Sequence, residues 1–277
     1  MIDSAALRAE ADSFPWYHSI DLGHGVTTKG QSVMAEMVTD AQLPDFRGRS
    51  VLDVGAWDGY YSFLAERRGA SRVVALDHYA WGVDFAARTQ YWNECFERGE
   101  LPDQSRDATD FWRPELPGRR GFDLAHRALD SRVEPVVADF TTTDLSTLGS
   151  FDIVLYLGVL YHMKEPLTCL ERLRAVTKHV AVIETVAAQV PGNEKRSLLE
   201  LHAGGELNAD FGNWYVPTIG ALGALARASG FARVDVMRGP PRLRARGRLA
   251  RRLHLVPSSR PDPAAANFRA VIQAFTP

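Results

Sequence analysis

The chain has 277 residues, enough for one large domain or for a core domain that carries an insertion. Hydrophobic residues make up 45% and charged residues 24%, as in ordinary globular enzymes, and the net charge of −2 gives no overall field that would attract nucleic acid or a membrane surface. The sequence has no 18-residue apolar span and no basic-then-apolar start, so we expect a cytoplasmic protein without a membrane span or secretion signal.

The basic residues and the cysteines indicate the source and redox state of the chain. Only four of the 32 basic residues are lysines, and this bias toward arginine indicates a GC-rich bacterial genome. Cys95 and Cys169 stand in different segments without metal-ligand spacing. We therefore expect two reduced thiols.

Residues 1–50 precede the first buried strand, and we expect them to form an N-terminal lead-in that acts as a lid. Residues 5–14 have helical spacing, and the aromatic-rich segment 16–23 favours an extended conformation. This segment would bring Tyr17 and His18 over the pocket of the domain that follows, which we expect to span 51–277.

Residues 51–62 predict a buried strand, a tight glycine turn and the start of a helix. Glycines allow close approach to a ligand, and a helix start offers free N–H groups, so this unit favours a nucleotide-sized ligand. Asp53, Gly55 and Gly59 follow the spacing D-x-G-x-x-x-G rather than G-x-G-x-x-G. The difference points to S-adenosylmethionine (SAM) rather than NAD.

Further apolar runs predict the rest of a doubly wound α/β sheet. Residues 72–77 form a second strand that ends in Asp77, 22 residues after Gly55, where a carboxylate can accept hydrogen bonds from ribose hydroxyls. A third strand, 133–138, leads to Asp139 and Phe140, where an acid can accept from an adenine amino group. A fourth apolar run, 151–162, leads into the expected reaction centre. Later strands are expected at 180–184, 232–237 and 268–275, with the last two as a closing hairpin, and helices at 165–176 and 218–229.

A long insert at 79–131 separates the second and third strands. It is rich in aromatic and charged residues, and a connection of this length is usually functional. We expect a substrate cap here, with a merely decorative helical insert as the alternative.

Three residues are candidates for chemistry. His162 lies at the end of the fourth apolar run, and histidine as a residue type suits the role of general base for a hydroxyl nucleophile. His18 is the second candidate for that role, although it could instead pack beside Trp16. Glu184, at the end of the fifth strand, could orient the substrate or His162, bind a divalent ion, or serve as a turn cap.

The segment around Asn213, Trp214 and Tyr215 is a candidate for substrate binding, because flat aromatic faces pack against sugars. Core packing is an equal alternative. Oxygen and nitrogen ligands for Mg²⁺ occur nearby without a recognisable metal spacing, so Mg²⁺ stays a secondary candidate cofactor. An arginine-rich run at 238–252 could bind RNA or an anionic substrate, but it lacks interleaved aromatics, and we favour a solvated loop.

These motifs resemble those of class I SAM-dependent methyltransferases. The sequence Leu157-Gly158-Val159-Leu160-Tyr161-His162, with Pro166 and Leu167, is similar to the branch that contains the tRNA wobble-uridine carboxymethyltransferases and bacterial sugar and small-molecule O-methyltransferases. The resemblance implies a Rossmann-like seven-stranded sheet and SAM as cofactor. With the glycine turn and lead-in, it gives these cofactor-binding candidates: Tyr17, Lys29, Asp53, Gly55, Ala56, Trp57, Gly59, Tyr60, Asp77, His78, Tyr79, Asp139, Phe140, Leu157 and Tyr161.

One departure from the carboxymethyltransferase pattern bears on the substrate. Those enzymes have a second N-terminal lysine that helps to hold a carboxylated SAM, whereas this chain has Glu10 or a neighbour there, and an acid would repel the extra carboxylate. We therefore expect transfer of a plain methyl group to a hydroxyl of a saccharide or other small molecule, such as a polysaccharide precursor. The alternatives are a tRNA wobble-uridine (carboxy)methyltransferase and a non-catalytic SAM-binding protein. The oligomeric state stays open, with a homo-oligomer as one candidate.

Overall fold

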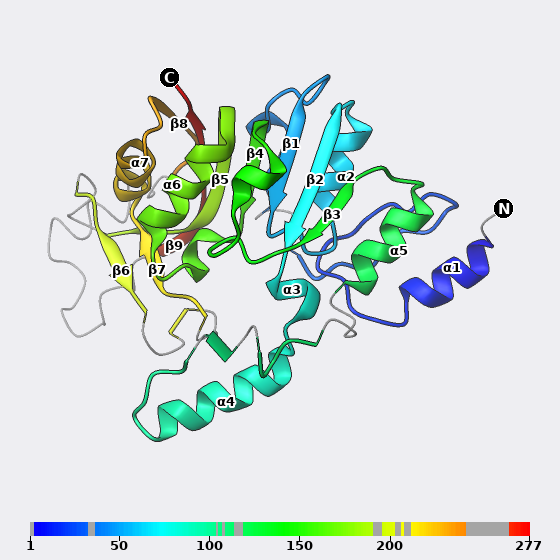
Figure 1. Ribbon diagram of the computed structural model, residues 1–277, viewed down its shortest axis with the longest axis horizontal. Helices are drawn as coiled ribbons and strands as arrows, with labels where there is room; N and C mark the ends of the chain where they lie inside the picture. Colours follow the sequence, from blue (N-terminus) through cyan, green and yellow to red (C-terminus); the bar gives the residue numbers. More distant parts are fainter. Residues whose placement is uncertain are drawn as a thin grey trace, which may run out of the picture.

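The computed structural model describes residues 3–32, 37–103, 105–106, 109–113, 119–190, 196–202, 206–207, 212–241 and 266–277. A seven-stranded sheet with the order β3-β2-β1-β4-β5-β9-β8 forms its centre (Figure 1). The strands are β1 (Ser50–Val54), β2 (Arg72–Asp77), β3 (Glu134–Val137), β4 (Phe151–Leu157), β5 (Thr177–Gln189), β8 (Arg233–Arg238) and β9 (Ala266–Phe275).

Five of these strands run parallel, and the sheet reverses its order between β1 and β4. β1 pairs in parallel with β2 on one side and with β4 on the other. The chain therefore builds the sheet outward from β1 to β2 and β3, and then returns to add β4 on the opposite side of β1. Ligands bind at such a switch point, outside the carboxyl ends of the strands. β9 runs antiparallel between β5 and β8, which confirms the closing hairpin and the predicted fold class.

Alternating side chains of the buried strands form two cores. Val51 and Val73 pack on one face of the sheet, and Leu52 and Val74 pack on the other. The first core is covered by α1 (Ser4–Ala11), α2 (Tyr60–Arg67) and α5 (Arg120–Ala128), and the second by α6 (Pro166–Val176) and α7 (Ile219–Ala228). Helices on both faces leave the strand ends as the place for a ligand.

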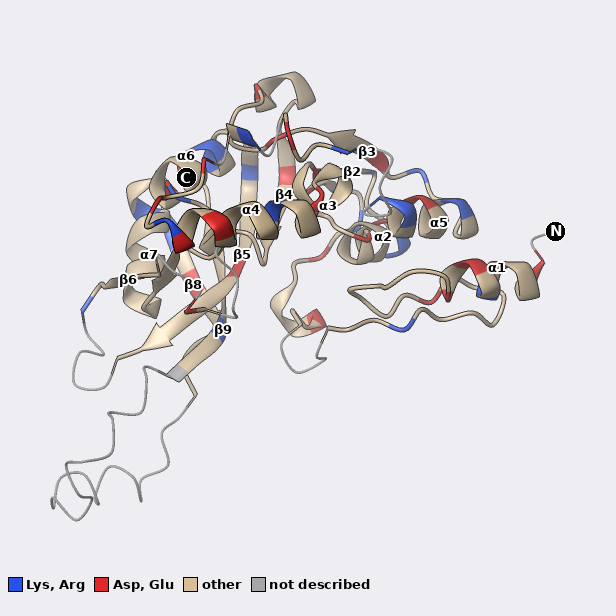
Figure 2. Ribbon diagram, turned by 90° about the horizontal axis from the view of Figure 1, so that it is seen from below, with Lys and Arg blue, Asp and Glu red and all other residues tan. Residues whose placement is uncertain are grey.

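The two halves of the predicted cap insert lie in different parts of the molecule. α3 (Tyr79–Gly82) and α4 (Phe85–Glu97) lie beyond the carboxyl ends of the strands, and the view from below shows α4 in front of β4 and β5 (Figures 1 and 2). In contrast, α5 packs against α2, where Phe122 stacks on Phe63 at a centroid distance of 5.2 Å. The α3–α4 part therefore covers the strand ends, while α5 belongs to a helical layer of the sheet.

The structure differs from the sequence prediction in two segments. β5 continues to Gln189, five residues past its expected end, because β9 pairs with it over the whole length. β6 (Leu199–Leu201) and β7 (Tyr215–Pro217) form a small antiparallel sheet that the sequence analysis did not predict. Of the arginine-rich run, residues 242–252 lie outside the described residues, whereas Arg238 donates hydrogen bonds to the Met37 carbonyl and to Gln42.

Candidate functional site

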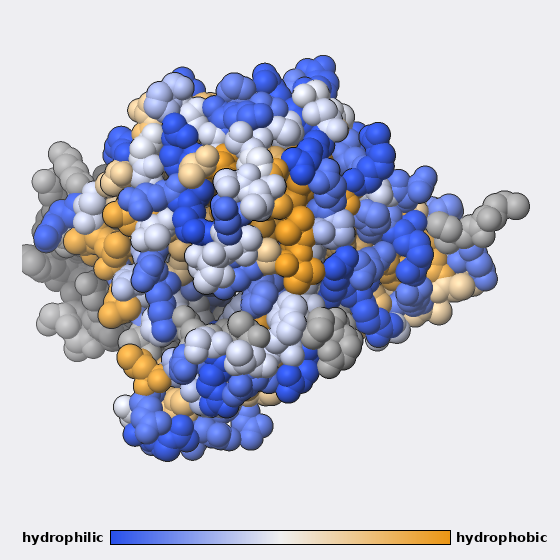
Figure 3. Space-filling view, viewed as in Figure 1, coloured by the Kyte–Doolittle hydropathy of each residue, from blue (hydrophilic) through white to orange (hydrophobic). Residues whose placement is uncertain are grey.

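A cavity of about 990 Å³ opens at the carboxyl ends of β1, β2, β4 and β5, and we call it the strand-end cavity. The space-filling view shows a hollow between the α4 lobe and the body of the sheet (Figure 3). Side chains from the lead-in, the strand ends, the cap and α6 line the cavity. Of the residues predicted from the sequence, these line it: Tyr17, His18, Asp53, Gly55, Ala56, Trp57, Asp77, His78, Tyr79, Asp139, Phe140, Leu157, Tyr161, His162 and Glu184.

The turn after β1 requires glycine at its first position. Gly55 has a φ of +77°, and a Cβ atom there would lie 2.6 Å from Cγ2 of Val159. Trp57 also has a positive φ, of 50°, and its N–H donates to Oδ2 of Asp77 at 2.9 Å. The turn is thus held against the end of β2 and leaves its backbone facing the cavity.

Asp77 closes β2 as a buried carboxylate. Its Oδ1 accepts from the backbone N–H of Ala80 at 2.9 Å, which also fixes the start of α3. Burial raises the pKa of Asp77 to about 6, although backbone hydrogen bonds counteract the shift. Asp53, at the floor of the same turn, accepts from Ser62 at 2.7 Å, and burial likewise raises its pKa to about 6.

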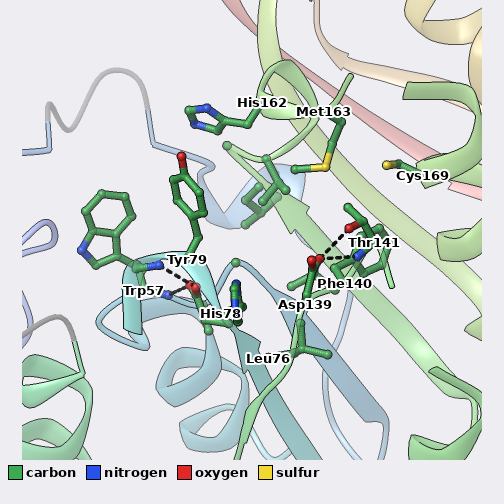
Figure 4. A pocket seen from close by; sticks show the side chains of 18 of the residues that line it. Trp57, Leu76, His78, Tyr79, Asp139, Phe140, Thr141, His162, Met163 and Cys169 are labelled. Carbon is green, nitrogen blue, oxygen red and sulfur yellow. Dashed lines mark hydrogen bonds between the residues drawn. The ribbon is translucent and has the colours of Figure 1, made fainter. Parts of the chain in front are cut away.

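A second polar group follows β3. Asp139 accepts hydrogen bonds from both the backbone N–H and the hydroxyl of Thr141, each at 2.7 Å. Figure 4 shows Asp139 and Phe140 across the cavity from Trp57 and Tyr79. The apolar side chains of Leu76, Met163 and Cys169 also line the cavity, so a flat ring could lie among them with Asp139 at its edge.

His162 lies at the end of the short 3₁₀ helix η4 (Leu160–His162), just after β4. Its Nδ1 is 3.0 Å from the carbonyl oxygen of Gly212. A carbonyl can only accept, so Nδ1 carries a proton, and in the neutral ring the lone pair is on Nε2. This is the protonation state that a general base requires.

His18 is held in a different way, by Asp58. Its Nδ1 donates to Oδ1 of Asp58 at 2.6 Å, and Oδ2 accepts the backbone N–H groups of Tyr17 and His18 at 3.1 and 2.6 Å. The ring of His18 also stacks on Tyr60 with a centroid distance of 5.0 Å. Asp58 therefore fastens the lead-in to the glycine turn. Sequence reasoning did not single out Asp58, although it lies inside the motif at 51–62.

Glu184 forms a buried ion pair with Arg269 of β9. Oε1 of Glu184 is 2.5 Å from Nε of Arg269, and both residues line the cavity. Burial raises the pKa of Glu184, while the positive charge of Arg269 counteracts the shift. Arg269 was missed because it lies 85 residues from its partner and in no recognisable motif.

Several predicted site residues lie away from the cavity. The side chain of Lys29 is 81% exposed, and its Nζ lies 2.9 Å from Oδ1 of Asp12. The structure therefore places Lys29 outside the cofactor pocket in which it was predicted. Glu10 pairs with Arg127 at 2.8 Å, outside the cavity lining, and repulsion of a ligand carboxylate by Glu10 no longer follows.

The remaining predicted residues outside the lining support their surroundings. Gly59 is the N-cap of α2 and has a φ of 83°, and the ring of Tyr60 stacks on that of His18. Asn213 is buried and donates to the Leu207 carbonyl. Trp214 packs on Trp92 with ring centroids 6.3 Å apart, and Tyr215 of β7 pairs with Leu201 of β6. These contacts match core packing rather than the proposed sugar platform.

Within the described ranges, no group of three or more His, Cys, Asp or Glu side chains is placed to hold a metal ion. The same part of the chain contains no helix of a length and hydrophobicity that would cross a bilayer. Cys95 and Cys169 are both buried and free.

Comparison with known proteins identifies the family. The family model described as a methyltransferase domain matches residues 27–236. The chain belongs to this family. The match includes the glycine turn, the ends of β2, β3 and β4, and the cap. The resemblance to class I SAM-dependent methyltransferases is thereby confirmed.

Curated relatives are distant and longer than this methyltransferase. It is 28% identical over 205 residues to the tRNA U34 carboxymethyltransferase of Idiomarina loihiensis, covering 70% of this chain and 49% of that protein. The enzyme of the same name from Pseudomonas putida is 27% identical over 193 residues, covering 69% and 48%. The chain thus spans about half the length of the curated relatives it matches.

Solved structures share the fold. The N-terminal domain of EvdMO1 with SAH bound has a TM-score of 0.61 and 17% identity, covering 100% of this chain and 98% of that one. A Haemonchus contortus phosphoethanolamine N-methyltransferase in complex with SAH has a TM-score of 0.52 and 14% identity, covering 84% and 50%. At this identity the likeness shows the fold alone.

Proposed function

We propose that this methyltransferase transfers a methyl group from SAM to a hydroxyl of a saccharide or another small molecule, such as a polysaccharide precursor. The observation that carries the proposal is the strand-end cavity itself. It brings together Asp77 and Asp139, the acids that we expect to bind the nucleoside, and His162, whose Nδ1 proton leaves Nε2 as the basic nitrogen.

The residues of the cavity fit SAM. Gly55 keeps the turn free of a side chain that would collide with Val159, and its backbone faces the cavity. Asp77 would accept from the ribose hydroxyls and Asp139 from the adenine amino group, with Leu76 and Phe140 beside the ring. Solved structures that share this fold, such as the N-terminal domain of EvdMO1, contain bound SAH, which supports the same cofactor.

SAM, when bound, supplies an electrophilic methyl group on a sulfonium sulfur. The role of the chain is to align the acceptor hydroxyl and to remove its proton. We assign proton removal to Nε2 of His162, with the Gly212 carbonyl holding the ring in the required tautomer. Glu184 and Arg269 would orient the acceptor as a fixed pair, and His18 with Asp58 would hold the lead-in over the reactants.

A second candidate is modification of a wobble uridine in tRNA, because curated relatives carry that name. The described residues favour the small acceptor. A carboxylated SAM would need a cation for its extra carboxylate. Lys29 pairs with Asp12 away from the cavity, and the charge of Arg269 is already paired with that of Glu184. In the view from below, lysines and arginines are interspersed with acids along the described ribbon (Figure 2).

The test is transfer of label from methyl-labelled SAM into a bacterial extract divided into RNA, protein, and glycan plus small-molecule fractions. We expect label in the last fraction, in a bond that resists mild base as an ether does. Label in RNA would establish the second candidate instead. SAM binding with no label in any fraction would point to a non-catalytic SAM-binding protein.

A further inference from the structure

Trp57 is a large apolar side chain that lines the strand-end cavity and stays in contact with solvent. It is 42% exposed, whereas Leu76, Phe140 and Cys169, which line the cavity around the expected adenine position, are buried. Figure 4 shows Trp57 across the cavity from Phe140. The indole therefore lies where the cavity is open, away from the expected adenine position, and covering it with a ligand would be favourable.

The backbone of Trp57 adopts a conformation that favours glycine. Its φ of 50° lies in the left-handed region, which is strained for a bulky side chain. Its N–H donates to Oδ2 of Asp77 at 2.9 Å, and its carbonyl accepts from the indole N–H of Trp81 at 2.5 Å. A turn required for folding alone would be less strained with glycine here. The retained strain therefore points to a function of the side chain itself.

The N-terminal lead-in supports the indole from one side. The ring of Tyr17 stacks on that of Trp57, with centroids 4.7 Å apart and an angle of 25° between the planes. The backbone N–H groups of Tyr17 and His18 both donate to Asp58 of the same glycine turn, which fixes the lead-in beside Trp57. We call Tyr17 and Trp57 the aromatic pair. Since Tyr17 covers one face of the indole and Trp57 is still 42% exposed, the other face can receive a ligand.

The aromatic pair lies next to the segment that carries the proposed base. The glycine turn packs against the chain that follows β4, because a Cβ atom at Gly55 would lie 2.6 Å from Cγ2 of Val159. Trp57 follows Gly55 closely in the chain, as His162 follows Val159. Tyr17, Trp57 and His162 all line the strand-end cavity. A ring stacked on Trp57 would therefore share this cavity with His162.

We propose that the exposed face of Trp57 is the binding platform of the acceptor, and that the acceptor presents a pyranose ring whose apolar C–H face stacks on the indole. This inference rests on the proposed methyl transfer to a saccharide. Stacking of a sugar face on a fixed aromatic ring leaves the hydroxyls at the edge of the sugar accessible to the base and to the methyl group. The platform takes the place of Trp214 and Tyr215, whose contacts match core packing.

The test uses the glycan plus small-molecule fraction of the bacterial extract as the source of acceptor. The initial rate of label transfer from methyl-labelled SAM is measured against the concentration of this fraction, for the unchanged protein and for Trp57→Asn. Asparagine tolerates a positive φ, so this variant loses the indole without new strain in the turn. We expect the apparent KM for the fraction to rise about tenfold or more while the maximal rate stays within about threefold, because a platform binds substrate and transition state alike.

Further variants distinguish a platform from a structural role. Trp57→Phe keeps an aromatic face and should recover part of the lost affinity. Leu201→Asn, at an exposed apolar residue outside the cavity lining, should leave the kinetics unchanged. Calorimetry should give an affinity for S-adenosylhomocysteine within about twofold of the original in both Trp57 variants, because each keeps the backbone N–H that binds Asp77. The circular dichroism spectrum reports whether each variant is folded.

Two results would overturn the inference. The first is an unchanged apparent KM in Trp57→Asn. The second is a loss of S-adenosylhomocysteine affinity as large as the loss of acceptor affinity, which would assign the indole to the cofactor. In both cases the unchanged protein still labels the glycan fraction, so methyl transfer to a saccharide stands. Label in RNA alone would overturn the proposed function, and the saccharide platform with it.

Discussion

His162 is the residue on which the proposed chemistry depends most. His162→Ala should leave the affinity for SAM within about twofold and lower kcat by about 10²- to 10⁴-fold, because a positioned general base contributes that much to proton removal. Kinetics across pH provide the measurement, since loss of the base should also remove the acidic limb of the kcat profile. His179→Ala, at an exposed histidine, is the control. Full turnover in the His162 variant would exclude this role.

Asp77 should determine cofactor affinity. Asp77→Asn keeps an acceptor for Trp57 but places an amide where the carboxylate would accept two ribose hydroxyls, so we expect SAM affinity to fall about 10- to 100-fold. Calorimetric titration with S-adenosylhomocysteine measures the change, and Asp45→Asn, at an exposed acid, is the matched control. Unchanged affinity in a folded Asp77 variant would refute the ribose contact.

At the scale of elements, the turn between β1 and α2 positions the cofactor by steric fit. Gly55→Ala should lower the free energy of unfolding by about 1–2 kcal/mol from its positive φ alone, and more from contact of the new Cβ with Val159. The double variant Gly55→Ala, Val159→Ala removes the contact but not the strain. Urea denaturation should therefore show partial recovery in the double variant, and additive losses would mean that Val159 is not the obstacle.

At the scale of the whole molecule, buried carboxyls couple stability to pH. The pKa of Asp53 is about 6 in the folded protein, above the 3.8 of the unfolded chain, because burial disfavours the charged form. The folded state therefore binds more protons between pH 4 and 6, and this group costs stability as pH rises through that range, by about 3 kcal/mol in total.

Asp53→Asn does not titrate and keeps an acceptor for Ser62. The free energy of unfolding of the variant minus that of the unchanged protein should therefore rise by about 3 kcal/mol between pH 4 and pH 7. Chemical denaturation of both proteins at several pH values gives the difference. A difference that does not vary with pH would show that Asp53 has an ordinary pKa.

Features that depend on residues close together in the chain were predicted, and features that depend on contacts between distant residues were not. Strands were located well because their apolar runs are local, and the acids that end β2 and β3 followed from the same runs. The end of β5 was placed too early because its last residues are strand only through pairing with β9. The cofactor-site assignments stay predictions, and the position of Lys29 does not support its own assignment. The position of Trp214 likewise does not support its predicted role in substrate binding.

The sequence by itself determined the fold class, the positions of the first five strands along the chain and the chemical types at their ends, because each depends on patterns within about twenty residues. Tertiary structure decided which charges are paired. Asp58 holds His18 across 40 residues, Arg269 reaches Glu184 across 85, and Arg88 meets the cavity because α4 folds over the strand ends. Such contacts depend on how the elements pack in three dimensions, and local sequence does not encode the distance between two side chains that are far apart in the chain.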